Sequence, residues 1–177
     1  GGADLLLEEL WPKLDLVVSL DNRINGAGMH ADVILPAAHE AERVNVQYPV
    51  SHTVEMVFSD KAVEPAGEAR SDWQIFGGIC AAIAERAGQR DMGDRKVGRA
   101  RRRRLADAYR SFTLDGALAT DEAMVDELVR DTALSGVVAE DASLAKLRKV
   151  GWEPIVGNGA FPSGQIFGGP FRADNIF

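Results

Sequence analysis

The sequence predicts an α/β fold, in which a parallel sheet carries flanking helices, and three observations lead to this prediction. Residues 16–20 form a continuous apolar run, as in a parallel strand that is covered on both faces. Residues 32–35 form a second short β run that Pro36 is expected to end, with a short crossover between the two runs. The stretch from Ser71 to about Ala87 carries apolar residues at helical spacing. Together these elements predict a partial Rossmann-like sheet.

Two further stretches lie before the first β run and after the second. Residues 4–11 predict a short helix. Residues 37–70 are expected to be irregular, apart from a β segment indicated by the alternation of Val54, Met56 and Phe58.

The helix that follows Ser71 has the clearest signature in the chain. Ser71 and Gln74 fit a capping box, and Asp72 lies in the first turn, where a negative charge interacts favourably with the helix dipole. We expect Trp73 to pack this helix onto the sheet and Gly88 to end it.

The C-terminal half is expected to be mainly helical. Residues 99–112 are predicted to form one helix. Thr120 is expected to cap a second, with acidic residues in its first turn, and Asp141 or Ser143 to start a third that ends at Gly151. Residues 89–98 are expected to be a charged linker, and the tail from Trp152 a crossing segment.

Composition excludes several classes of function. The 177 residues carry a net charge of −7, which argues against generic nucleic-acid binding. The single cysteine excludes an internal disulfide and a cysteine-ligated iron–sulfur cluster within these residues. No apolar run approaches the length of a membrane span, so no direct membrane insertion is expected. Both ends have the character of a cut chain, so we expect a fragment of a longer protein.

The strongest candidate site is the triplet Asp21, Asn22 and Arg23, which follows the first predicted strand. Ligands bind outside the carboxyl ends of the strands in open α/β sheets. An Asp can accept hydrogen bonds from a guanine or ribose edge, and an Arg can hold a phosphate bidentately. The alternative interpretation is an Asx-turn with a solvated arginine.

The histidines do not predict a metal site. His30, His39 and His52, with Glu40 and Glu42, lack the spacings that place metal ligands on one face. We expect ordinary surface or interface histidines, which argues against a mononuclear metal hydrolase.

Three further groups are expected to have structural roles. Glu42 and Arg43 are interpreted as a buried pair that fixes a loop, with a weak surface ion pair as the alternative. The basic run at residues 99–104 is expected to be a solvated helix face rather than a phosphate or nucleic-acid site. Cys80 is expected to be a small buried hydrophobic residue.

Two stretches of the chain resemble the pterin-binding region of the molybdopterin oxidoreductases, also called the DMSO reductase family. They are His-Ala-Asp-Val-Ile-Leu-Pro-Ala-Ala at residues 30–38 and Gly-Glu-Ala-Arg-Ser-Asp-Trp at residues 67–73. The stretches Leu-Trp-Pro-Lys-Leu-Asp-Leu-Val-Val and Ser-Leu-Asp-Asn-Arg, at residues 10–23, are similar to the nitrate reductase-like branch. Residues 44–49 depart from the Gly-Thr-x-x-Asn-x-Glu-Gly-Arg pattern of the family, which excludes the formate dehydrogenase type and leaves the substrate open.

The resemblance implies a fragment of a multi-domain catalytic subunit that uses molybdenum and a bis-(molybdopterin guanine dinucleotide) cofactor. It implies that Asp21, Asn22, Arg23 and Asp72 contribute to cofactor binding, while no catalytic residue or metal ligand lies in this chain. The molybdenum ligand and an iron–sulfur cluster would lie in other parts of the polypeptide. The implied partners are the remainder of that polypeptide and an iron–sulfur electron-transfer subunit, with no nucleic acid. A periplasmic location is favoured over a cytoplasmic one.

Within that implied protein we expect three segments. Residues 1–90 would belong to the α/β pterin-binding domain, residues 91–151 would be helical, and residues 152–177 would be a linker to a further C-terminal domain. The fragment alone would be inactive. Two alternatives stay open: a non-catalytic relative such as the large iron–sulfur subunit of complex I, and an unrelated α/β nucleotide-binding module.

Overall fold

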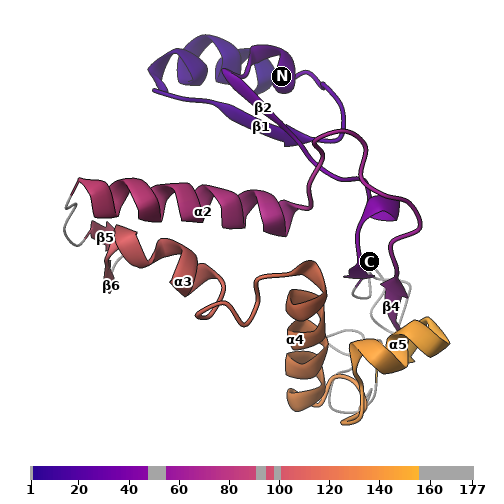
Figure 1. The fold of residues 1–177 in the computed structure, drawn as a ribbon. Helices are drawn as coiled ribbons and strands as arrows, with labels where there is room; N and C mark the ends of the chain where they lie inside the picture. Colours follow the sequence, from indigo (N-terminus) through magenta and orange to yellow (C-terminus); the bar gives the residue numbers. More distant parts are fainter. Residues whose placement is uncertain (1, 48–54, 91–94, 98–100, 156–177) are drawn as a thin grey trace, which may run out of the picture. The chain divides into compact units, whose positions relative to one another are not determined.

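The structure, a computed structural model, describes residues 2–47, 55–90, 95–97 and 101–155 (Figure 1). The chain divides into two compact units, which are described separately. The first unit comprises Gly1–Arg43 and Val63–Asp115, and the second comprises Val44–Ala62 and Gly116–Phe177. The segment boundaries expected near residues 90 and 151 concern the larger protein and stay a prediction.

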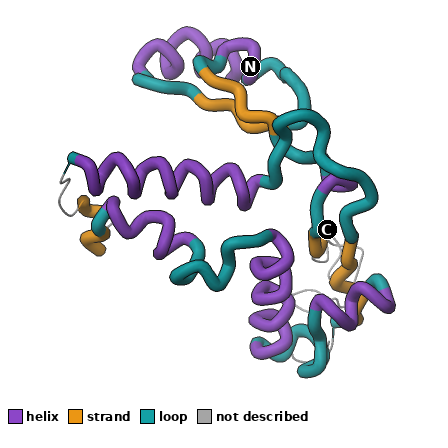
Figure 2. Tube along the Cα trace, in the orientation of Figure 1, coloured by secondary structure: helices purple, strands orange, loops and turns teal. Residues whose placement is uncertain are grey.

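The first unit contains the predicted parallel strand pair. Strands β1 (Val18–Asp21) and β2 (Val33–Pro36) pair in parallel, with Val18 opposite Val33 and Asp21 opposite Pro36 (Figure 2). The crossover between them contains a short 3-10 helix, Gly28–His30. The α/β class predicted from the two apolar runs is therefore confirmed.

Strand β1 differs from the prediction in two respects. It begins at Val18, later than the start of the apolar run, and it includes Asp21, which is its last residue rather than the first residue after it. Val18 is 38% exposed and Val33 41% exposed, so the described elements do not cover both faces of this pair. A continuous apolar run needs further elements on each face to be buried.

The sheet also continues beyond β2, although Pro36 was expected to end it. The Pro36 carbonyl accepts a hydrogen bond from the Arg70 N–H at 3.2 Å, and the Ala38 N–H donates to the Arg70 carbonyl at 2.7 Å. Ala37 and Arg70 thereby form a parallel bridge. Proline lacks an N–H but keeps its carbonyl, so it can begin a pairing that the next residues complete.

Helix α2 (Asp72–Gln89) begins after Ser71, the N-cap that its sequence predicts. The Ser71 Oγ accepts a hydrogen bond from the Gln74 N–H at 3.1 Å, and Ser71 itself is buried. The predicted stop at Gly88 is wrong, because the helix continues to Gln89 and the Arg90 N–H still donates to helix carbonyls. Gly88 does not adopt the left-handed backbone that ends many helices.

Helix α2 packs against α3 (Ala108–Phe112), and the two helices run alongside each other in Figure 1. The Trp73 ring stacks on the Phe112 ring at a centroid distance of 4.2 Å, so its packing onto the sheet was predicted wrongly. Gly77 is buried, and a Cβ built there would lie 3.6 Å from the Phe112 ring. Cys80 is partly exposed rather than buried.

The N-terminal helix is confirmed but irregular. It consists of α1 (Gly2–Leu5), a π-helical turn (Leu6–Leu10) and a 3-10 turn (Trp11–Lys13). The Trp11 Nε1–H donates to the His30 carbonyl at 3.1 Å, which ties this stretch to the crossover.

The basic run does not form a helix. Residues 95–97 and 101–103 form the antiparallel strands β5 (Arg95–Val97) and β6 (Arg101–Arg103), followed by a 3-10 turn (Leu105–Asp107) before α3. The expected linker and the expected solvated helix face are therefore wrong at these residues. Arginine is a good helix former, but helix propensity is a weak determinant, so strand pairing can override it.

The second unit combines an antiparallel sheet with two helices. Its strands β3 (Asn45–Gln47), β4 (Glu55–Ser59) and β7 (Trp152–Pro154) pair in the order β3-β4-β7, and its helices are α4 (Asp121–Leu134) and α5 (Leu144–Val150). The predicted β segment around Met56 and Phe58 is confirmed, while Val54 lies outside the described residues. The tail from Trp152 contributes a strand and is not only a crossing segment. The core comprises Val44, Val46, Met56, Val125, Val129, Ala133, Val138, Ala142, Leu144 and Leu147.

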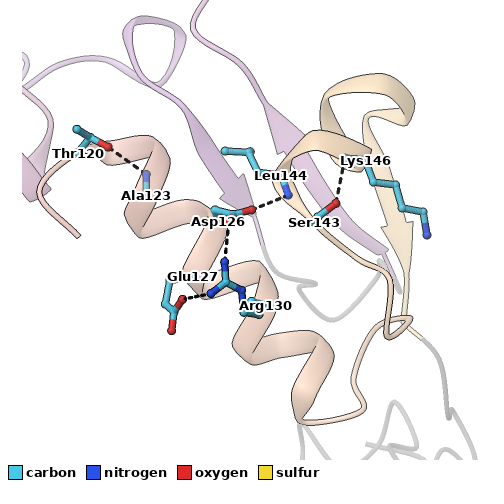
Figure 3. Close-up of polar contacts among 8 residues, drawn as sticks. All are labelled: Thr120, Ala123, Asp126, Glu127, Arg130, Ser143, Leu144 and Lys146. Carbon is cyan, nitrogen blue, oxygen red and sulfur yellow. Dashed lines mark hydrogen bonds and ion pairs between the residues drawn. The ribbon is translucent and has the colours of Figure 1, made fainter. Parts of the chain in front are cut away.

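Both helices of the second unit have the predicted polar caps (Figure 3). The Thr120 Oγ1 accepts the Ala123 N–H at 3.1 Å, and the Ser143 Oγ accepts the Lys146 N–H at 3.3 Å. Ser143, not Asp141, is thus the cap of α5, and Gly151 ends that helix with φ of 81°.

Asp126 joins the two helices of this unit. Its Oδ1 accepts the Leu144 N–H at 3.1 Å, and its Oδ2 binds Arg130 at 3.1 Å (Figure 3). A side chain of α4 therefore satisfies a free N–H in the first turn of α5.

Candidate functional site

A cleft of about 430 Å³ lies in the first unit where β1 and β2 end. Residues from three places in the chain line it: the β1 end, the segment after β2, and the loop before α2. They are Asn22, Arg23, Pro36, Ala37, His39, Glu42, Ala66 and Ala69. This is the position at which open parallel sheets bind ligands.

The β1 end is shaped by an Asx-turn. The Asp21 Oδ1 accepts the Arg23 N–H at 3.3 Å, and its Oδ2 accepts a hydrogen bond from the Asn25 side chain. The Asn25 Oδ1 in turn accepts the Gly28 N–H at 2.9 Å. Asp21 therefore holds the loop, while the exposed side chains of Asn22 and Arg23 line the cleft.

Glu42 forms the opposite part of the cleft. One carboxylate oxygen accepts the His39 N–H at 2.8 Å, and the other accepts the Ala66 N–H at 3.1 Å. The carboxylate thus connects two segments that are far apart in the sequence. The expected structural role of Glu42 is confirmed.

The expected pairing of Glu42 with Arg43 is wrong. Arg43 contacts Asp72 instead, with 3.8 Å between Nη1 and Oδ2, so each member of the dipeptide fixes a different segment. Adjacent residues leave the backbone in different directions, which explains the separate partners. The Arg43 Nε is buried and has no hydrogen-bond partner among the described residues.

Asp72 does not share the cleft with Asn22 and Arg23. It is the first residue of α2, its side chain is 55% exposed, and its partner is Arg43. Its contribution to a cofactor site stays a prediction, and the observed contact gives it a role in holding the start of α2.

His39 is the functional candidate that motif reasoning missed. It caps the 3-10 helix Glu40–Glu42: its Nδ1 accepts the Ala41 N–H at 3.3 Å, and the Glu42 side chain returns a bond to the His39 N–H. The spacing His-x-x-Glu copies the capping box Ser/Thr-x-x-Glu, a signal that could have placed His39 at the start of a helical turn. From the sequence, His39 was considered only as a candidate metal ligand.

A second cleft of about 390 Å³ lies along α2 in the same unit. It has a mainly apolar lining with two charged side chains, formed by Leu35, Pro36, Glu68, Arg70, Ile75, Gly78, Ile79 and Ala82. It includes part of the apolar stripe of α2, of which Ile75 is buried and Phe76 is half exposed.

Ion pairs in the second unit connect segments of its fold. The Arg148 Nε donates to the Asp60 carboxylate at 3.0 Å and holds the pKa of that carboxyl below its ordinary value. Lys146 Nζ binds both Asp141 and the buried Glu153 at 2.8 Å, and these hydrogen bonds raise the pKa of Lys146. These pairs tie α5 to neighbouring segments of its unit.

Within the described ranges, no group of three or more His, Cys, Asp or Glu side chains is arranged to hold a metal ion. The helices described by the structure include none that is both long and apolar enough to cross a membrane.

The chain is similar to one protein family, both in a family model and in individual relatives. Residues 3–82, which include β1, β2 and the cleft residues, match the family model for molybdopterin oxidoreductase. The chain is 33% identical over 125 residues to the perchlorate reductase subunit alpha of Dechloromonas aromatica. The aligned residues make up 69% of this chain and 13% of that protein.

Two further relatives show similar coverage. The respiratory nitrate reductase subunit alpha of Haloferax mediterranei is 34% identical over 146 residues, covering 77% of this chain and 14% of that protein. The dimethylsulfide dehydrogenase subunit alpha of Rhodovulum sulfidophilum is 34% identical over 117 residues, covering 66% and 13% respectively. The chain thus spans a small part of the length of the relatives it matches.

Proposed function

Because this chain belongs to the molybdopterin oxidoreductase family, we propose that it forms part of the catalytic subunit of a molybdenum-dependent oxidoreductase and helps to bind a molybdopterin guanine dinucleotide. The similarity to nitrate and perchlorate reductase alpha subunits supports the nitrate reductase-like branch. The whole enzyme would include an iron–sulfur cluster and an iron–sulfur partner subunit, and its molybdenum ligand would lie outside this chain.

The observation that carries this proposal is the cleft where β1 and β2 end. Its lining fits a ligand with phosphate groups, since the exposed Arg23 guanidinium can donate two parallel hydrogen bonds to phosphate oxygens. The Asn22 amide offers both a donor and acceptor for a base or ribose edge. Small residues at positions 37, 66 and 69 leave room for a ligand between these groups.

In this proposal the residues of the chain bind and orient, and the bound cofactor supplies the electron-transfer chemistry. Asp21 acts indirectly, because its carboxylate is occupied with the Arg23 N–H and the Asn25 side chain. Glu42 keeps the other side of the cleft in place through its two backbone hydrogen bonds.

The test replaces Arg23 by alanine in the full-length enzyme. Release of the guanylyl-pterin after dilution would be followed by pterin fluorescence and by molybdenum content per protein. Loss of hydrogen bonds to a charged group costs about 1.5–3 kcal/mol each, so release should accelerate about tenfold or more.

The matched control is Arg86→Ala, which removes an exposed arginine from α2 without touching the cleft. Release at the wild-type rate in both Arg23→Ala and Asn22→Ala would refute the proposal. That result would favour a non-catalytic relative in which this loop has only a structural role.

A further inference from the structure

His39 is an aromatic, hydrogen-bonding side chain of the cleft that has no role yet in the proposed function. It lines the cleft with Asn22 and Arg23, and its ring is at the same time fixed by the backbone. The His39 Nδ1 accepts the Ala41 N–H at 3.3 Å, while the His39 N–H donates to Glu42 at 2.8 Å. The imidazole is therefore held at the edge of the site by contacts within its own turn.

This hydrogen bond fixes the tautomer of the ring. A nitrogen that accepts a hydrogen bond carries no proton, so in the neutral imidazole the proton lies on the other nitrogen. The hydrogen bond to the Ala41 N–H occupies Nδ1, which leaves Nε2–H as a donor. His39 consequently offers the cleft a hydrogen-bond donor rather than an acceptor.

The other polar groups of the lining favour a ligand that accepts hydrogen bonds. Arg23 supplies only donors, and Asn22 supplies donors from its amide nitrogen. Glu42 also lines the cleft and carries a negative charge. Both of its carboxylate oxygens already accept hydrogen bonds from backbone N–H groups. The balance of this surface is thus towards donors.

We propose that the Nε2–H of His39 donates a hydrogen bond to an anionic oxygen of the cofactor, beside the contact made by Arg23. This inference rests on the proposed function, and it adds a binding residue whose protonation pattern is set by a helix cap. The ligand group is a phosphate oxygen, since a phosphate presents several acceptors to neighbouring donors.

Two substitutions in the full-length enzyme separate the donor role from the cap role. His39→Ser keeps an N-cap oxygen for the Ala41 N–H but removes the distal donor, because serine is a preferred cap and is short. His39→Gln keeps a long amide donor and gives up the preferred cap. Both variants would be measured for the rate of guanylyl-pterin release and for the midpoint of thermal unfolding without cofactor.

The expected result is a crossed pattern. His39→Ser should release the cofactor about tenfold faster at an unchanged unfolding midpoint, because a hydrogen bond to a charged group is lost and the cap is kept. His39→Gln should release the cofactor near the wild-type rate and unfold at a lower temperature.

The outcomes also distinguish this inference from the proposed function. Faster release from Arg23→Ala, together with wild-type release from His39→Ser, would overturn the inference about His39 alone. Equal acceleration in His39→Ser and His39→Gln would overturn it too, because the donor would then be irrelevant. Wild-type release from Arg23→Ala, Asn22→Ala and His39→Ser would overturn both proposals.

Discussion

Replacement of Leu147 by alanine tests how much the buried core of the second unit contributes to stability. Leu147 lies on α5 with 0% exposure, within a cluster that includes Met56, Val125 and Val129. The substitution removes three carbon atoms from a site without solvent, which corresponds to a transfer cost of about 2.4 kcal/mol. The cavity left behind raises the expected loss of unfolding free energy to about 3–4 kcal/mol.

The chain provides a matched control for this substitution. Leu134, at the end of α4, is 79% exposed, so Leu134→Ala removes the same atoms from a solvated position. We expect this control to change the unfolding free energy by less than about 0.5 kcal/mol. Urea denaturation followed by far-UV circular dichroism would measure both variants. Equal losses in the two variants would refute the placement of Leu147 in a buried core.

Two further predictions concern the cap of α2 and an ion pair. Ser71→Ala should lower the unfolding free energy by about 1 kcal/mol, since the Gln74 N–H loses its acceptor, while Ser71→Asp should restore most of it; unchanged urea midpoints in both would contradict the cap. Asp60 has a folded-state pKa below its ordinary value because Arg148 donates a hydrogen bond to its carboxylate. The ion pair therefore stabilises the folded state fully above the ordinary pKa of Asp60, and this stabilisation is lost as pH falls through the folded-state pKa. Asp60→Asn should therefore make unfolding less sensitive to acid over that range, and a wild-type acid profile would contradict this assignment.

The sequence predicted helix ends well where one local interaction determines them. Ser71, Thr120 and Ser143 each accept a backbone N–H three residues further on, and each was expected at or next to that position. A cap depends on the conformation of four residues, so a single sequence contains the information that it needs. Gly151 was also predicted, and it adopts the left-handed backbone for which glycine has no steric cost.

Strands were not predictable in the same way. Residues 152–154 pair with β4, and residues 101–103 pair with β5 although their sequence, three arginines, has no apolar alternation. A strand needs its partner for stability, and the partner of β7 lies far away in the sequence. The sequence therefore predicted only a crossing segment at residues 152–154.

The candidate site shows the same division. Asn22 and Arg23 were expected at a strand end, because an apolar run followed by polar residues is a local pattern. Ala66 and Ala69 were not expected there, because a hydrogen bond to Glu42 brings their loop to the cleft from a distant part of the chain. His39 was missed because a histidine cap resembles neither a metal ligand nor a usual capping residue.

The core of the second unit combines segments that the ribosome synthesises at well-separated times. Met56 is fully buried, but the helix that supplies Leu147 to the same cluster comes from the far end of the described chain. At about 5–20 residues per second, Leu147 leaves the ribosome roughly 5–20 s after Met56. During that interval β3 and β4 emerge without their helices and without β7, so the side chains of Val46 and Met56, buried in the finished unit, are exposed to solvent. We expect nascent chains that end before α4 to bind chaperones strongly. Nascent chains that extend beyond residue 155 should bind chaperones weakly, because the core can then form.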